Sequence, residues 1–191
     1  MANRVKYGLK NVYYAKATID SNNVATYGTP KPWTGAVSLS LDAEGGTTKF
    51  RADNIDYWVG QSNNGYSGDF ESALIPDDFR KEILGDIVDD AGVMVEDASA
   101  KTVYFALLFQ FEGDDKNTRH IMYKCSATRP SVSGSTTEEE IEPQTETLSI
   151  TATAVHNSDI DADVVKARCL ESDTPYETWF NAVYQPTTVS A

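Results

Sequence analysis

The sequence predicts a mainly β protein with a β-sandwich or barrel-like fold, one flanking α-helix and long loops. Apolar and polar residues alternate with a period of two along much of the chain, as in strands that bury one face. Aromatic residues that favour strands are frequent, with ten Tyr, seven Phe and three Trp against only three Met. A chain of 191 residues can build one core. We therefore expect a single domain over residues 1–191, with a polar arm at about 129–143 and a C-terminal segment, 156–191, that the pattern does not place.

The charge of the chain argues against a protein that grips nucleic acid. The formal net charge is −13, and the Lys and Arg residues do not cluster. Affinity for phosphates comes from clustered cations, so DNA near this protein should be repelled. The composition, 40% hydrophobic and 24% charged, is that of an ordinary globular protein.

The lack of an apolar leader segment in residues 1–20 and the cysteine usage both indicate a reducing compartment. Residues 1–20 contain no apolar leader segment, and the longest apolar run, 103–109, is far short of a membrane span. Cys125 and Cys169 have no neighbouring Cys or His at metal-ligand spacing. We expect a protein folded in a cytoplasm, with both cysteines reduced and packed, although a single disulfide stays possible.

Two hairpins are expected in the first third of the chain. Residues 37–50 alternate and contain Glu44-Gly45-Gly46, which predicts a turn there. Asn64-Gly65 predicts a second turn, because both residues tolerate positive φ. A two-residue loop at that point would place Trp58 and Asp56 on one face with Asp69 and Glu71, and a loop of odd length would change this register.

The rest of the chain yields one helix and further strands. Residues 75–85 predict a helix, with Pro76 at its first position and Gly85 at its end. A third hairpin pairs two apolar stripes across a polar turn. One stripe comprises Val103, Phe105, Leu107, Phe109 and Phe111, and the other Ile121, Tyr123, Cys125 and Ala127.

The last third of the chain starts with a polar segment and ends in an aromatic cluster. Residues 129–143 read as an exposed loop or arm, and a strand follows that buries Leu148, Ile150, Ala152 and Ala154. The spacing of the C-terminal aromatics favours a helical turn docked on the sheet, although a strand is possible. These aromatics are Tyr176, Trp179, Phe180 and Tyr184.

No catalytic or metal-binding motif stands out. His120 and His156 occupy strand ends outside any nucleophile motif, and exposure is the simplest interpretation of both. The acids at 159, 161 and 163 resemble the start of a calcium loop, but Val164 and Leu170 stand where such a loop needs Gly and Glu.

A cleft for glycoside hydrolysis is the sharpest catalytic hypothesis. Carboxylates on one sheet face can reach the required separation, and Trp58 could stack on a sugar. However, one acid would need an apolar pocket to raise its pKa, and this face has little apolar surface. We therefore expect no enzyme activity, no cofactor and no metal.

Several long segments, taken in chain order, resemble the major tail proteins of bacteriophages with long, non-contractile tails. They are NVYYA, GAVSLSLDAEGGTTKF, ADNIDYWVGQSNNGYSGDFESALIPDDFRKEILG, FALLFQFEGDDKNTRHIMYKCSATRP and STTEEEIEPQTETLSITAT. The resemblance covers about residues 4–155. It implies a structural tail tube subunit in the virion, assembled in the host cytoplasm, whose hexameric rings stack into a tube around a tape-measure protein. Tail terminator and tail-tip proteins are further implied partners, and genomic DNA passes through the tube without specific binding.

This resemblance gives the acidic residues a role. A negative lumen would repel the DNA backbone and let the genome slide. The candidate lumen-lining acids are Asp42, Asp56, Asp69 and Glu71. Polar loops could become ordered against a neighbouring ring, and the candidate contacts there are Glu44, Glu138, Glu139 and Glu140.

Two other functions remain open at this point. A carbohydrate-binding adhesion module would use Tyr57, Trp58 and Tyr66 to stack on sugars. A glycosidase would use Asp69 or Glu71. The solution size of the protein separates the polymer from the monomeric alternatives.

Overall fold

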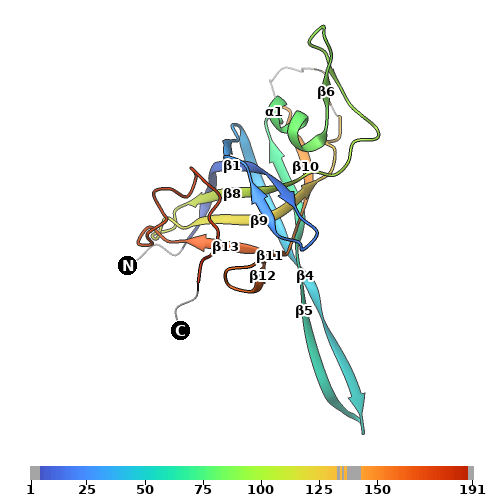
Figure 1. Ribbon diagram of the computed structural model, residues 1–191, viewed down its shortest axis with the longest axis vertical. Coiled ribbons are helices and arrows are strands. Elements are labelled where there is room, and N and C mark those ends of the chain that lie inside the picture. Colours follow the sequence, from blue (N-terminus) through green and yellow to red (C-terminus); the bar gives the residue numbers. More distant parts are fainter. Residues whose placement is uncertain (1–4, 133, 135, 137–142, 189–191) are drawn as a thin grey trace.

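The computed structural model describes residues 5–132, 134, 136 and 143–188 (Figure 1). Strands make up 53% of it, and one helical segment of eight residues is present. The predicted β class is therefore confirmed. Within the described residues no helix is long and apolar enough to cross a membrane.

One large antiparallel sheet organises the molecule. Its strands are β1 (Tyr7–Ile19), β2 (Ala25–Tyr27), β3 (Lys31–Pro32), β4 (Ala36–Ala52), β5 (Ile55–Ser72), β8 (Tyr104–Glu112), β9 (Arg119–Ala127), β10 (Glu146–Thr153) and β13 (Lys166–Cys169). The order is β2-β1-β8-β9-β10-β5-β4, while β3 pairs with β1 and β13 pairs with β9. The sheet curls enough for β1 and β4 to contact each other. In the described part of the chain it does not close into a barrel.

Apolar side chains pack on both faces of the central strands β1, β8 and β9. On one face, Phe70 of β5 and Phe79 of the helix join Phe105 and Leu107 of β8 in one core cluster. On the other face, Trp179 packs in a second cluster with the remaining side chains of these strands. Burial on both faces is why β8 is an almost continuous apolar run, since neither of its faces meets water.

The first two predicted hairpins are wrong, because the structure has one much longer hairpin in their place. The strands β4 and β5 pair along their whole length, from Ala36↔Ser72 to Ala52↔Ile55. Residues 44–46 are extended and do not turn, and the pairs assigned across Asn64-Gly65 do not form. Trp58 lies opposite Phe50 rather than Glu71.

The turn lies at Asp53-Asn54, with φ values of 50° and 63°. Two consecutive positive φ values are those of the tight turn that matches strand twist, and Asp and Asn tolerate them. Gly65 does have the expected positive φ, at 100°, but it sits where β5 leaves β10 and not in a turn. A Cβ at this position would lie 1.9 Å from the Ala152 carbonyl oxygen, so the close approach of two strands requires glycine.

The third hairpin is confirmed as β8 and β9, but its face assignment is only half right. The register shifts between Phe105↔Cys125 and Leu107↔Met122, so β9 contains an extra residue there. Cys125 consequently faces the first cluster, as expected. Ile121 belongs to the second cluster, on the opposite face.

The predicted helix is confirmed between β5 and β6. It comprises α1 (Asp77–Phe79) and a continuing π-helical turn, η1 (Arg80–Leu84), and it ends at Gly85 with a φ of 85°. Pro76 precedes the first turn as the cap residue instead of occupying its first position. Phe79 and Ile83 are the side chains that attach the helix to the first cluster.

The described residues also form two small two-stranded sheets. They pair β6 (Ile87–Val88) with β7 (Met94–Val95), and β11 (Val155–Asn157) with β12 (Ala162–Val164). The β6–β7 hairpin and the β4–β5 turn lie at opposite ends of the molecule (Figure 1).

The predicted strand after residue 143 is confirmed as β10, whose Leu148, Ile150 and Ala152 are buried. The aromatic cluster of the C-terminal segment belongs to the second core cluster. Trp179 is 1% exposed, and consecutive hydrogen-bonded turns from Asp173 to Asn181 dock this segment on the sheet. Both cysteines are free and buried, as predicted.

Candidate functional site

The outer half of the β4–β5 hairpin projects from the body as an arm (Figure 1). The strand β10 pairs with β5 only from Tyr66 to Ser72, so β5 has no second neighbour from Ile55 to Gly65 among the described residues. We call residues 43–65 the arm. Neither edge of the arm pairs with a further strand in the described part of the chain, and natural proteins usually shield such edges because they template pairing with another chain.

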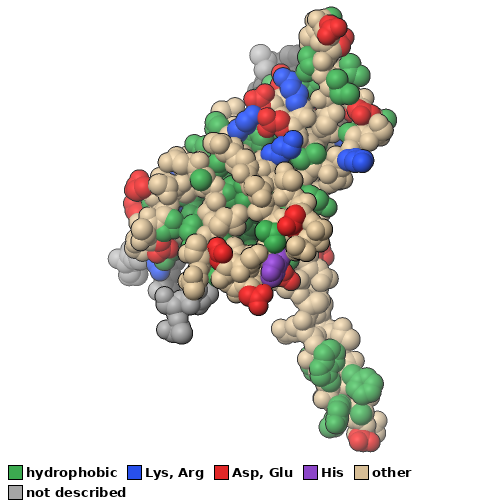
Figure 2. Space-filling view, viewed as in Figure 1, with side chains coloured by type: hydrophobic (Ala, Val, Ile, Leu, Met, Phe, Trp, Pro, Cys, Tyr) green, Lys and Arg blue, Asp and Glu red, His purple; other side chains and the backbone are tan. Residues whose placement is uncertain are grey.

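Large hydrophobic side chains are exposed at the end of the arm (Figure 2). We call them the tip patch: Phe50, Ile55, Tyr57, Trp58 and Val59, between 49% and 71% exposed. Single exposed apolar residues are ordinary, but five gathered at the end of one two-stranded ribbon are typical of an interaction site. None of them belongs to either core cluster or packs against one.

Local contacts fix the shape of the tip. The Asp56 carboxylate binds the Lys49 ammonium at 2.8 Å and lies 3.3 Å from the Arg51 guanidinium. The indole of Trp58 lies over Gly60, where a Cβ would come within 2.1 Å of the ring. The glycine thus lets the tryptophan lie along the ribbon.

The structure separates Asp56 from the other three predicted lumen-lining acids. Asp56 lies beside the turn, 13 residues along the same extended strand from Asp69, a span of roughly 40 Å at ~3.3 Å per residue. Its charge is compensated by two cations. The error comes from the misassigned turn, which had folded these two acids onto one short hairpin.

The other three predicted acids do share a surface. They lie on the exposed face of β4, β5 and β10, in cross-strand rows that each hold one carboxylate and two hydroxyls. The rows are Ser38, Glu71 and Thr147; Ser40, Asp69 and Ser149; and Asp42, Ser67 and Thr151. We call these nine residues the acidic face. It carries no cation, and its side chains are short.

Hydrogen bonds hold the acids of this face in place. The Ser149 hydroxyl donates to Asp69 at 2.8 Å. Glu71 accepts from the Thr145 hydroxyl at 2.6 Å and from the Ser38 hydroxyl at 3.0 Å. These bonds, that from Thr145 first, lower the pKa of Glu71. A general acid needs the opposite shift, so Glu71 is fixed as a carboxylate.

The predicted ring-to-ring contacts are only partly described. Glu44 does not lie in a loop; it is on β4 at the base of the arm and accepts a short hydrogen bond from Ser67. Glu138, Glu139 and Glu140 lie outside the described residues.

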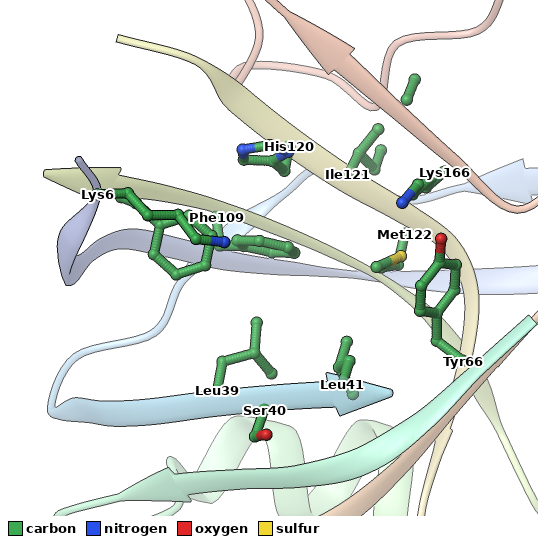
Figure 3. A pocket seen from close by; sticks show the side chains of 12 residues that line it. Lys6, Leu39, Ser40, Leu41, Tyr66, Phe109, His120, Ile121, Met122 and Lys166 are labelled. Carbon is green, nitrogen blue, oxygen red and sulfur yellow. The ribbon is translucent and has the colours of Figure 1, made fainter. Parts of the chain in front are cut away.

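A pocket of about 350 Å³ opens at the seam where β4 approaches β8, β9 and β13 (Figure 3). We call it the seam pocket. Its lining mixes apolar and aromatic residues with two lysines, a serine and a histidine, and comprises Lys6, Leu39, Ser40, Leu41, Tyr66, Phe109, Phe111, His120, Ile121, Met122, Lys166 and Ala167. The ammonium of Lys6 lies 4.6 Å from the Phe111 ring centre, and that of Lys166 lies 4.4 Å from the Tyr66 ring centre. Two cations already in contact with aromatic faces thus border the slot.

The histidines are less exposed than the sequence predicted. His120 is half-buried and stacks on Phe109 at 5.3 Å between ring centres, and burial is the main cause that lowers its pKa. His156 is half-buried in β11, with its Nδ1 3.3 Å from an Asp163 carboxylate oxygen. Among the described residues, no group of three or more His, Cys, Asp or Glu side chains could hold a metal ion.

Sequence reasoning missed the tip patch and the rows of hydroxyls. The rows were detectable, because SLSLD and TLSIT place Ser and Thr at every second position of two strands. The tip patch was hidden by the assumed turn at Asn64-Gly65, because a turn there places residues 55–59 away from the end of the hairpin.

No protein-family model matches this chain, and the search of curated proteins finds no match either.

Proposed function

We propose that this protein is a structural subunit that assembles with copies of itself into a hollow tube of stacked rings, as a bacteriophage tail tube protein does. The observation that carries the proposal is the arm, which combines two unpaired strand edges with an exposed tip patch. A soluble monomer gains nothing from such a ribbon and risks aggregation. In an assembly, the same features become a contact between subunits.

Self-association through this arm favours polymers. The arm and the body are different surfaces, and a contact between different surfaces is heterologous, so it builds rings or open filaments rather than closed pairs. Hexameric rings, a tape-measure protein in the lumen, and terminator and tip proteins at the ends complete the proposal through the family resemblance.

The acidic face supplies a wall for DNA passage. Short hydroxyl side chains and uncompensated carboxylates offer a phosphate backbone no cation to bind, so the genome would slide along it. We place Asp42, Asp69 and Glu71 in the lumen, and we withdraw Asp56 because it is paired with cations at the tip.

The size of the purified protein tests the assembly. We expect sedimentation to show concentration-dependent polymers, and negative-stain images to show tubes of uniform width. A protein that stays monomeric over the whole accessible concentration range would refute the proposal.

The acidic face has a separate test. The triple variant Asp42→Lys, Asp69→Lys and Glu71→Lys should still fold, because all three positions lie at the surface. Assembled tubes of the variant should retain DNA, with an affinity that falls steeply as salt rises, whereas wild-type tubes should not. If tubes of the variant retain no more DNA than wild-type tubes, other strands line the lumen.

A carbohydrate-binding adhesion module is the second candidate, since Tyr57 is 71% exposed and Trp58 is 56% exposed. Tyr66, the third aromatic residue of that hypothesis, does not lie near them. Tyr66 lies in the seam pocket, eight residues along the strand from Trp58, or roughly 26 Å away. A stable monomer that binds cell-wall glycan would favour this alternative.

A further inference from the structure

We propose that the seam pocket of one subunit receives the tip patch of another copy, with Trp58 as the side chain that enters it. This inference rests on the proposed self-assembly and specifies which two surfaces meet. It starts from two features of the same chain that each lack a binding partner within the described residues of one subunit. One is a set of exposed apolar side chains, and the other is a preformed slot whose lining residues are mostly apolar or aromatic, with two lysines at its border.

The chemistry of the two surfaces matches. Leu39 and Leu41 form one wall of the slot, and Phe109 and Met122 lie across from them (Figure 3). A pocket of about 350 Å³ accommodates an indole. The ammonium groups of Lys6 and Lys166 already lie over aromatic rings at the rim. They would face an inserted indole in the same way, and tryptophan provides the best ring for such contacts.

The backbone beside the slot matches as well. The strand β4 is the last in the order of the main sheet, so its outer edge has no strand partner in the described part of the chain. A strand of another arm can add to such an edge through main-chain hydrogen bonds while alternate side chains enter the adjacent pocket. The tip therefore has both backbone and side-chain partners at this seam.

The contact has to be intermolecular. Phe50 at the tip and Leu41 at the pocket are nine residues apart on one extended strand, which separates them by about 30 Å. The tip cannot reach its own pocket unless the β4–β5 pairing breaks. Because every copy has both surfaces, each subunit gives a tip and receives one, and the assembly grows with an axial repeat on the order of 30 Å.

Site-specific crosslinking tests this geometry. The exposed Tyr57, next to Trp58, is replaced in one preparation by Tyr57→Cys, and the exposed Arg168, two positions beyond Lys166 on β13, in another by Arg168→Cys. The native cysteines are buried and should not react. A short bismaleimide should join the two variants only when they are mixed. Tyr57→Cys mixed with Val95→Cys, at the opposite end of the molecule, is the control and should give no product.

A charge reversal tests the role of the lysines. Trp58→Lys would bring a third cation to the rim and should raise the protein concentration needed for assembly at least tenfold. Adding Lys166→Glu to this variant should restore most of the loss. The matched control is Ile87→Lys, since Ile87 is 57% exposed and Trp58 is 56% exposed, and it should assemble like the wild type.

The outcomes separate this inference from the proposed function. If wild-type tubes form but Trp58→Lys assembles normally, or Tyr57→Cys crosslinks to itself, the tip binds elsewhere and only this inference fails. The same holds if wild-type tubes form and the mixture gives no crosslink. If the wild-type protein forms no polymer at all, the proposed function fails with it.

Discussion

The two halves of the β4–β5 hairpin have the same secondary structure, but they differ in whether their apolar side chains are buried. In the body half, Phe70 is fully buried and Leu39 packs beside it. In the arm half, Phe50 and Trp58 pair across the same two strands and are more than half exposed. Folding free energy explains the apolar residues of the body half but not those of the arm, because burial is what makes an apolar side chain stabilising. The folding of the free subunit therefore does not account for the tip patch, whereas the proposed contact with another copy would.

The largest expected difference between the halves is in stability. Phe70→Ala removes a ring that contacts Trp33 at 4.9 Å between ring centres and leaves a cavity. It should lower the free energy of unfolding by ~3–5 kcal/mol. Trp58→Ala should change the stability of the free subunit by no more than about 0.5 kcal/mol. Urea unfolding of both variants, under conditions where the subunit is monomeric, measures the contrast. Comparable losses would mean that the arm belongs to the folding core.

The next largest effect concerns the junction between the halves. Gly65→Ala places a methyl group against the Ala152 carbonyl oxygen in a backbone conformation with a φ of 100°. The steric clash and the strained backbone together should lower the free energy of unfolding by roughly 2 kcal/mol. Gly46→Ala, in the arm, is the control, because no atom lies within 4 Å of its new methyl group. Its unfolding midpoint should match that of the wild type, and an equal loss in both variants would contradict the role of the junction.

The same junction shows what the sequence could and could not predict. The alternation of SLSLD and the positive φ at Gly65 were both correct local expectations. Their combination failed because a glycine that permits a turn also permits a close approach between strands, and local sequence does not distinguish these uses. Asp53-Asn54 was the weaker turn signal of the two and yet the real turn.

The candidate surfaces were predictable to different degrees for a related reason. Three of the four acids share a face because they lie near the body end of the hairpin, where their alternation sets the face whatever the turn does. Asp56 and the tip patch depend on where the chain reverses. The seam pocket depends on the curl of the whole sheet, since its lining comes from segments between residues 6 and 167. No local pattern encodes that curl.

The smallest expected effect lies on the acidic face and depends on pH. Hydrogen bonds from Thr145 and Ser38 lower the pKa of Glu71 from its ordinary value of 4.5. The stability that these bonds add to the ionised form is therefore fully present above pH 4.5, and it is lost as the pH falls through the lowered pKa of the folded protein. Glu71→Gln should be slightly less stable than the wild type at pH 7, and the two unfolding midpoints should converge at the acid end of a titration.

Thr145→Val should raise the pKa of Glu71, as followed by the NMR shifts of its side chain. A gap between wild type and Glu71→Gln that stays constant with pH would mean that these hydroxyls do not favour the charged carboxylate. The acidic face would then owe its charge to solvent exposure alone, like any other acidic surface, and only the arm would keep features that the folding of the free subunit does not explain.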